Sequence, residues 1–373
     1  MKITNINIVL EKKTIFGDIE FNETITKIKE KGKFKKGYPI LTPGFIDTHI
    51  HGSASYDVLD GTVDAVHKMA LSLVKEGTTT FYPTPMTQSK SVIKKSLESI
   101  YEYYKNQDPN AANIEGIHLE GPYFNVDARG AQPKEYIKNP DIKEFEEYNN
   151  SCGYLIKKVS VAPELPGSLE FIKYLVSNNI HPSIAHTRAT YKEALEGYKA
   201  GATSLTHTYN AMTPIHHRDI GVVGLGYLKD IMCELIYDEI HVSPPAARLL
   251  IRNAGVDRVM LITDSMRNKG MPEGISELGG QKVIIKNGEA RLENGALAGS
   301  ILRMIDGYNN LRRLGYSYVS LAKLTATNAS KHFNLSDRGM INEGLRSDFV
   351  LLSPNHEIIK TFINGKVVYE INC

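Results

Sequence analysis

The chain has 373 residues, of which 42% are hydrophobic and 23% charged, a composition typical of soluble globular proteins. This length fits one large barrel with a small accessory domain. The formal net charge of +2 gives no reason to expect a nucleic-acid partner. No apolar run approaches the ~18 residues of a membrane span, so we expect no membrane segment.

The cysteines and the N-terminus indicate the compartment. Cys152, Cys233 and Cys373 are odd in number and far apart, and they lack C-x-x-C spacing. Disulfides and thiolate metal ligands are therefore not expected. No apolar segment follows a basic N-terminal stretch, as it would in a secretory signal. We expect a protein of the reducing cytoplasm.

The first forty residues alternate between apolar and polar side chains. Residues 3–10 and 14–21 show the period of two that predicts short antiparallel strands. Residues 27–36 are basic but interleaved with Ile, Gly and Phe, which is typical of a solvated strand and turn. These strands bury too little apolar surface to be stable alone.

The next segment, residues 42–52, carries two histidines at the end of an apolar strand. His49 and His51 are two residues apart, so in a β-strand both imidazoles point to the same face. Gly52 follows and lets the backbone turn away. This pair predicts two ligands for a divalent metal, provided that other strands supply matching ligands.

Short apolar strands then alternate with helical stretches, for example helices at residues 90–104 and 191–199. With the strand that ends at His49, the strand candidates number eight; the others are residues 78–84, 113–120, 157–164, 181–187, 202–207, 231–238 and 258–264. Eight such units predict an α/β fold, a (β/α)8 TIM-type barrel. A doubly wound open sheet is the competing fold, but it gives no reason for polar residues at the strand ends.

An apolar, alternating stretch at residues 282–292 predicts a hairpin inserted after the last barrel strand. The chain then ends on strands at residues 347–352 and 358–369, with Asn364-Gly365 as a type I′ hairpin turn. We expect the two chain ends to form one small, discontinuous β-sandwich domain, residues 1–42 plus 340–373. Residues 43–339 would form the catalytic barrel.

The predicted barrel strands end in residues that bind metals. In a barrel all carboxyl ends meet at one mouth, where the catalytic groups of this fold lie. Imidazole and carboxylate together suit zinc, iron, manganese or cobalt better than calcium. Four histidines and two carboxylates would therefore meet around one point at this mouth: His49, His51, Glu120, His186, His207 and Asp264.

These residues predict a hydrolytic reaction. A metal held by Glu120, His186 and His207 would lower the pKa of water toward neutrality and so supply a nucleophile for an amide carbonyl. Asp264 could take the water's proton and pass it to the leaving amine. A barrel that only binds its ligand is the alternative from another class, but it predicts an eroded ligand set, and none of these positions is eroded.

Seven motifs resemble a known family. The run Pro43-Gly-Phe-Ile-Asp-x-His-x-His-Gly52 resembles the first-strand signature of the metal-dependent amidohydrolase superfamily. Within it, the chain resembles the N-acetylglucosamine-6-phosphate deacetylase family over essentially its whole length. Two motifs are specific to this deacetylase branch, namely His118-Leu-Glu-Gly-Pro122 and Thr206-His-x-Tyr-Asn-Ala-Met212. The other matching motifs are Ala185-His-Thr187, Asp238-x-x-His-Val242, Thr263-Asp264 and Leu297-Ala-Gly-Ser300.

The resemblance implies a role for each ligand position. Glu120, His186 and His207 match the principal metal ligands, and His49 and His51 match those of a second metal. One or two divalent ions per subunit are therefore expected, zinc first, with iron, cobalt or manganese as alternatives. Asp264 matches the general base and acid.

The resemblance also implies how the substrate is bound. The backbone amides of Asn210 and Ala211 match phosphate-binding positions. Arg218 matches a phosphate ligand supplied by a neighbouring subunit, which implies a homodimer. His241 matches a contact to a sugar hydroxyl and the transition state. The remaining substrate-lining positions are Ala131, Gln132, Asp238, Leu297, Ala298 and Gly299.

The expected reaction is hydrolysis of N-acetylglucosamine 6-phosphate to glucosamine 6-phosphate and acetate. Its galactosamine epimer and a cyclic amide of the dihydroorotase or hydantoinase kind are alternative substrates. Glu120 stands where many superfamily members carry a bridging lysine, which argues against the cyclic-amide reading. Three residues depart from the family pattern and bear on the exact sugar: Gln132, Ser265 and Arg303.

Overall fold

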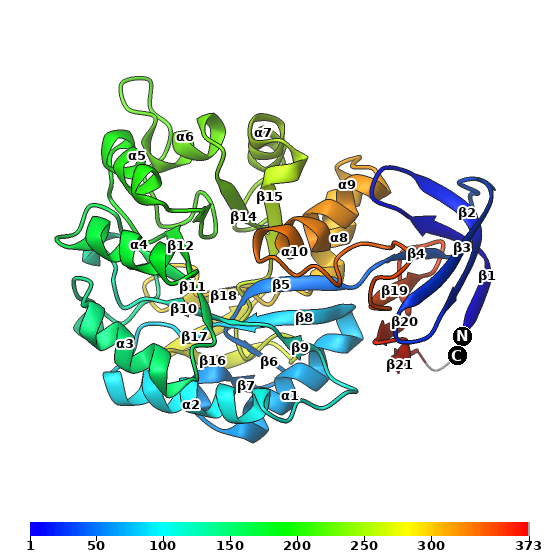
Figure 1. The fold of residues 1–373 in the computed structure, drawn as a ribbon. Helices are drawn as coiled ribbons and strands as arrows, with labels where there is room; N and C mark the ends of the chain where they lie inside the picture. The colour runs from blue at the N-terminus through cyan, green and yellow to red at the C-terminus, as the bar shows by residue number, and fades with distance from the viewer. Residues whose placement is uncertain (372–373) are drawn as a thin grey trace.

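The computed structural model describes residues 1–371 and consists of a barrel with a smaller sheet at its side (Figure 1). Cys373, named above, lies outside the described residues. The eight barrel strands are β5 (Phe45–Ile50), β8 (Thr78–Pro83), β10 (Ile117–Glu120), β11 (Ile156–Val161), β12 (His181–Ile184), β13 (Ser204–Leu205), β14 (Met232–Ile236) and β15 (Val259–Ile262). The predicted eight-stranded barrel is confirmed.

The barrel closes through two narrow contacts. Strands β10 to β15 pair in sequence order as one parallel sheet, and β5 pairs with β8, which also pairs with β9 (Asn113–Ile114). Single parallel bridges, Met86 with Glu120 and Ile50 with Ser265, join these two pieces at the carboxyl ends of the strands. An open sheet has no such closure. The bridges include Glu120 and a neighbour of Asp264, so the closure itself positions the predicted site.

Helices cover the outside of the barrel. The helices at residues 90–104 and 191–199 are confirmed, and Thr190 with Glu193 forms a capping box at the start of the second. The helices are α1 (Val63–Leu73), α2 (Lys90–Tyr104), α3 (Ile142–Ser151), α4 (Ser168–Ser177), α5 (Tyr191–Ala200), α6 (Gly221–Leu228), α7 (Pro244–Ala254), α8 (Met304–Arg313), α9 (Tyr318–Ala322) and α10 (Asn328–His332). Short turns of 3-10 helix lie at Val58–Asp60, Val74–Glu76, Val126–Ala128, Lys134–Tyr136 and Val256–Arg258, and one π-helical turn at Lys323–Thr327.

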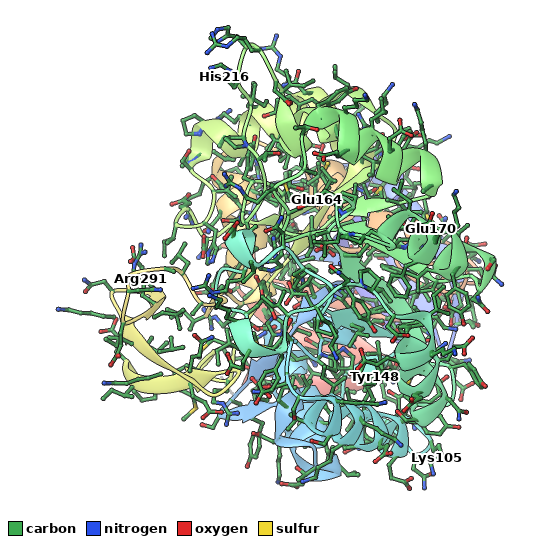
Figure 2. All side chains as sticks on the ribbon, turned by 90° about the vertical axis from the view of Figure 1, so that its left-hand side faces the viewer. Lys105, Tyr148, Glu164, Glu170, His216 and Arg291 are labelled. Carbon is green, nitrogen blue, oxygen red and sulfur yellow. The ribbon has the colours of Figure 1, made fainter. Side chains whose placement is uncertain are left out.

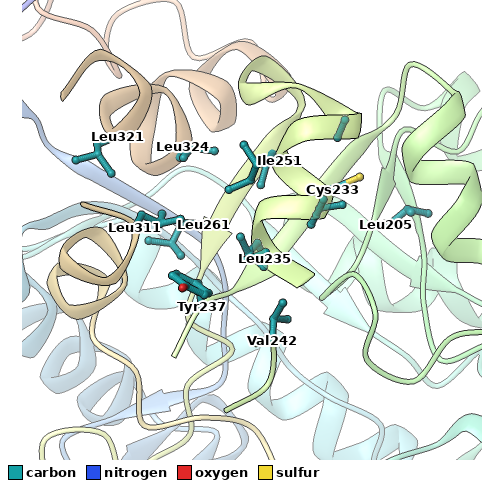
Figure 3. Packing of buried hydrophobic residues seen from close by; sticks show 14 of the residues in the cluster. Leu205, Cys233, Leu235, Tyr237, Val242, Ile251, Leu261, Leu311, Leu321 and Leu324 are labelled. Atoms are coloured by element: carbon teal, nitrogen blue, oxygen red, sulfur yellow. The ribbon is translucent and has the colours of Figure 1, made fainter. Parts of the chain in front are cut away.

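The largest apolar core lies between the strands and this helical layer. Figure 3 shows Leu235 and Leu261 of β14 and β15 beside Ile251 of α7 and Leu311 of α8. Each of these side chains is at most 2% exposed. Burial of one such side chain contributes roughly 1.5–3 kcal/mol. This core holds the strands rigidly, so their ends can present polar groups in fixed positions.

Both chain ends contribute to one small β domain, as predicted, and its seven strands pair as a single sheet. Its order is β21 (Lys366–Glu370), β20 (Ile358–Ile363), β19 (Phe349–Leu352), β4 (Ile40–Pro43), β1 (Lys2–Val9), β2 (Thr14–Phe21) and β3 (Ile25–Lys33). The predicted turn at Asn364 and Gly365 is confirmed, with φ of 51° and 75°. Figure 1 shows the blue strands from the start of the chain and the red strands β19 to β21 together in this sheet beside the barrel.

The hairpin predicted at residues 282–292 is confirmed as part of a larger insertion. It is formed by β17 (Gln281–Lys286) and β18 (Glu289–Leu292), but a third strand, β16 (Gly274–Leu278), pairs with β17. The sequence missed β16 because only Leu278 of this strand is buried. A two-stranded ribbon, β6 (Gly52–Ser53) with β7 (Tyr56–Asp57), follows the first barrel strand. Among residues 1–371, no helix is both long and apolar enough to span a membrane.

Candidate metal centre and active site

Five barrel strands end in the predicted ligands. His49 belongs to β5 and Glu120 is the last residue of β10, while the others lie one or two residues beyond their strands. His186, His207 and Asp264 have φ of 42°, 33° and 49°. Residues other than glycine rarely adopt this left-handed conformation, which costs of order 1–3 kcal/mol and concentrates at functional sites. The fold therefore accepts local strain in order to present these three side chains.

Glu120 lies at the centre of the cluster. Its Oε1 is 3.4 Å from the Nε2 atoms of His49 and His186 and 3.2 Å from that of His207. Its Oε2 is 3.4 Å from the Nε2 atom of His51. One carboxylate thus contacts all four imidazoles, which places Glu120 between the two predicted metal positions.

The ligand atoms fall into two groups. Glu120, His186 and His207 form the first group, and His49, His51 and Asp264 form the second, with all ligand atoms of a group within 4.8 Å of one another. Asp264 Oδ1 is 2.9 Å from His51 Nε2 and 3.5 Å from His49 Nε2. Asp264 is therefore within reach of the second group as a ligand, in addition to its predicted role as general base.

The four imidazoles are oriented by acceptors on their other nitrogen. Each Nδ1 faces an oxygen, so the proton resides on Nδ1 and the Nε2 lone pair is available for a metal. The acceptors are the carbonyl of Thr84 for His51 (2.7 Å), that of Ala128 for His186 (2.9 Å), that of Asn210 for His207 (3.2 Å) and the carboxylate of Glu234 for His49 (3.3 Å).

The donor set fits a divalent metal of the zinc type. His49 Nε2 is buried without a hydrogen-bond partner among the described residues, which is costly unless a cation binds there. Burial alone would raise the pKa of Glu120, but His49 and the hydrogen bonds of His186 and His207 outweigh it and lower this pKa well below its usual range. An ionised carboxylate and imidazole nitrogens are ligands that suit zinc, iron, cobalt and manganese.

A pocket of about 370 Å³ opens above these groups. It is lined by most of the predicted site residues, namely His51, Glu120, Ala131, Gln132, His186, His207, Asn210, Ala211, His241, Asp264, Leu297 and Gly299. His49 lies fully buried behind the lining, and Ala298 is buried beside it. The wall also includes Leu278 at the end of β16, so the inserted sheet forms part of the pocket.

Two predicted site residues, Asp238 and Arg218, do not line the pocket. Asp238 Oδ2 lies 2.6 Å from His241 Nδ1 and so holds the imidazole that lines the pocket. Arg218 is exposed, does not line the pocket of its own chain and has its Nη1 atom 2.8 Å from His217 Nε2. Figure 2 shows neighbouring His216 at the tip of a loop that stands out from the molecule.

One of the two backbone amides predicted to bind phosphate already has a hydrogen-bond partner within the chain. The backbone N–H of Asn210 donates to the carbonyl of His207 at 2.9 Å. Phosphate binding by Asn210 therefore requires that this hydrogen bond be shared or replaced. Tyr209 and Ala211 have φ of 83° and 52°, so this loop is held in an unusual conformation directly after the predicted ligand His207.

The three departures from the family pattern have different surroundings. The Gln132 amide donates to Glu120 Oε2 at 2.8 Å and accepts from the backbone N–H of Thr87 at 2.9 Å. Its side chain thus contacts the predicted metal ligand Glu120. The Ser265 hydroxyl donates to the carbonyl of Gly52 at 3.0 Å, and Arg303 pairs with Asp306 at the surface. Neither Ser265 nor Arg303 lines the pocket.

Sequence reasoning missed two buried charges beneath the cluster. Glu234 of β14 and Lys158 of β11 form an ion pair, and both side chains are fully buried. The available signal was a single acidic residue in the otherwise apolar β14 and two adjacent lysines, Lys157 and Lys158, in β11, of which one must face inward because side chains alternate along a strand. Charges of that kind are almost never buried unless they are paired.

The closed barrel and its two groups of ligands define the class, a metal-binding (β/α)8-barrel enzyme. The Amidohydrolase family model matches residues 40–368. The chain therefore belongs to the amidohydrolase family and is a metal-dependent amidohydrolase.

Curated relatives share most of the chain. An N-acetylglucosamine-6-phosphate deacetylase of Bacillus subtilis (strain 168) is 39% identical over 335 residues, which cover 88% of this chain and 85% of that protein. An N-acetylgalactosamine-6-phosphate deacetylase of Escherichia coli O157:H7 is 33% identical over 331 residues, covering 88% and 87%.

Solved structures have the same fold. The N-acetylglucosamine-6-phosphate deacetylase of Thermotoga maritima superposes with a TM-score of 0.92 at 34% identity and covers both chains completely. A variant of the Mycobacterium smegmatis enzyme in complex with N-acetyl-D-glucosamine-6-phosphate has a TM-score of 0.93 at 25% identity and covers 99% of each chain.

Proposed function

We propose that this amidohydrolase removes the acetyl group of N-acetylglucosamine 6-phosphate, which yields glucosamine 6-phosphate and acetate. The observation that carries the proposal is the convergence of four imidazoles, Glu120 and Asp264 at one pocket, which all of them line except the buried His49. The relative with 39% identity and both solved structures described above carry the name of this activity.

We assign the cofactor as one or two divalent ions, with zinc as the resident metal and iron, cobalt or manganese as alternatives. Glu120, His186 and His207 would hold the first ion, and His49 and His51 the second, across Glu120. An ion held there would lower the pKa of a bound water toward neutrality and would polarise the acetamide carbonyl. Elemental analysis of the purified protein identifies and counts the ions.

The chain's own residues then move the proton and bind the sugar. Asp264, at the pocket floor, takes the proton of the attacking water and delivers it to the leaving amine nitrogen. His241, oriented by Asp238, contacts a sugar hydroxyl and the carbonyl oxygen as negative charge develops there. We assign Ala131, Gln132 and Leu297 to Gly299 to the remaining substrate surface.

Acetate release from three sugars tests this function. Metal-loaded protein should deacetylate N-acetylglucosamine 6-phosphate with a kcat/KM at least about tenfold above that for N-acetylglucosamine, because the phosphate adds charged hydrogen bonds of about 1.5–3 kcal/mol each. Equal turnover of the two sugars would disprove phosphate recognition. A higher kcat/KM for N-acetylgalactosamine 6-phosphate would instead assign the epimer.

We further propose a cytoplasmic homodimer in which Arg218 binds the phosphate held in the neighbouring chain. The exposed position of Arg218, outside its own pocket, supports this assignment. Its guanidinium can donate two parallel hydrogen bonds to a phosphate. The cytoplasmic assignment is supported by the free, buried thiols of Cys152 and Cys233.

Hybrid dimers test the contribution of Arg218. Arg218→Ala should raise KM for the sugar phosphate by about tenfold or more while KM for the unphosphorylated sugar stays unchanged. Mixing Arg218→Ala chains with Asp264→Asn chains should restore activity, because in each hybrid dimer one site has both Asp264 and an Arg218 from its neighbour. A mixture no more active than its separate components would overturn the shared site.

A further inference from the structure

We infer that Glu234 is a positioning residue for the second metal position, acting through His49 and kept charged by Lys158. This inference rests on the second ion proposed above at His49 and His51. It starts from a difference among the four imidazoles. Three of them donate from Nδ1 to a main-chain carbonyl, whereas His49 donates to a side chain, the carboxylate of Glu234 at 3.3 Å.

Glu234 contacts both halves of the metal centre. Its Oε2 accepts from His49 Nδ1 and also from the backbone N–H of His207 at 3.3 Å. Its Oε1 accepts from the Thr48 hydroxyl at 3.3 Å and from Lys158 Nζ. The Glu234 carboxylate is fully buried, so no solvent can replace these partners. One carboxylate on β14 therefore connects one ligand of each group.

The hydrogen-bond chemistry determines which nitrogen of His49 can bind a metal. An ionised carboxylate can only accept, so it keeps a proton on Nδ1 and leaves the Nε2 lone pair free. His49 Nε2 is the buried atom that has no hydrogen-bond partner among the described residues. In the other three rings a main-chain carbonyl keeps the proton on Nδ1, and a substitution cannot remove that carbonyl. His49 is the one ring of the four whose Nδ1 acceptor is a side chain, so its orientation can be tested by mutation.

Lys158 explains why a carboxylate is tolerated at this depth. Burial of an unpaired carboxylate is costly, and the ammonium of Lys158, on β11, compensates the charge within the barrel interior. An ammonium can only donate hydrogen bonds, so the atom of residue 234 that faces Lys158 must be an oxygen. If Glu234 becomes glutamine, the amide oxygen turns to Lys158 and the amide N–H₂ group faces His49. His49 Nδ1 must then accept, so the proton moves to Nε2 and blocks the metal.

Zinc titration of Glu234→Gln tests the inference. Wild-type protein and variants are dialysed against buffers of defined free Zn²⁺, and bound zinc is counted by elemental analysis. The variant should retain the first ion, because His207 Nδ1 keeps its carbonyl acceptor, and should bind the second ion about 10- to 100-fold more weakly. Ser160→Ala is the matched control, since the buried Ser160 hydroxyl bonds to His118 and Thr206 and to none of the predicted ligands, and this variant should bind two ions.

The double variant Glu234→Gln, Lys158→Met provides a rescue. Without the ammonium, the amide oxygen is free to accept from His49 and His207, so the second ion should bind again. This outcome distinguishes positioning from a general loss of packing, and it decides the question if Glu234→Gln alone does not fold. Circular dichroism establishes folding of each variant.

Three results would overturn the inference. The first is a Glu234→Gln variant with wild-type affinity for both ions. The second is a folded double variant that still lacks the second ion. The third is wild-type protein that binds a single ion at saturating zinc, which would also remove the second ion from the proposed function. Acetate release is measured separately, so failure of the deacetylase assignment is distinguishable from all three.

Discussion

Replacing Glu120 by glutamine is expected to remove zinc binding and to lower kcat/KM for the sugar phosphate by at least about 10³-fold. Glu120 contacts all four imidazoles, so the loss of its charge affects both ligand groups. The metal contributes several kcal/mol of transition-state stabilisation, and every 1.4 kcal/mol corresponds to a factor of ten. Bound zinc by elemental analysis and acetate release at saturating metal measure the two effects.

A matched control for Glu120→Gln is Glu144→Gln. This substitution also removes a mostly buried carboxylate, one that pairs with Lys138 outside the pocket. It should leave zinc content and kcat/KM at wild-type values. If Glu120→Gln retained two ions and turned over substrate at more than about a tenth of the wild-type rate, the assignment of Glu120 as the shared ligand would be wrong.

Replacing Asp264 by asparagine is expected to lower kcat by about 10²- to 10⁴-fold, the contribution typical of a positioned general acid or base. Asparagine keeps the size of the side chain but cannot take a proton from water. The ion bound by Glu120, His186 and His207 should remain, because Asp264 is outside that group. Single-turnover acetate release and zinc content measure the two properties on the same preparation.

The zinc content of Asp264→Asn also decides what else Asp264 does. Asp264 lies within reach of His49 and His51, so selective loss of one ion would assign it as a ligand of the second position as well. Asp57→Asn is the control: this carboxylate is buried, caps a turn through the N–H of Leu59 and does not line the pocket. Wild-type kcat in Asp264→Asn would exclude Asp264 as the base.

The barrel and most of the cluster were predictable because strand period and strand ends are local properties. His49 and His51 are two residues apart, and parallel strands of a barrel place their carboxyl ends at one mouth. The third strand of the insertion was not predictable, since β16 buries only Leu278 and has little apolar pattern. The link between Gln132 and Glu120 was likewise hidden, because it joins a loop to a strand end.

The amino-acid sequence by itself determined the residue types at the strand ends, and these predicted the barrel, a divalent-metal site and the family. Only the tertiary structure decided which of these residues lie together in each group of ligand atoms. Whether Asp264 lies with His51 and whether Glu120 spans both groups depend on distances between strands that are far apart in the chain. The pairing of Lys158 with Glu234 under His49 depends on barrel closure, which brings β11, β14 and β5 around one interior.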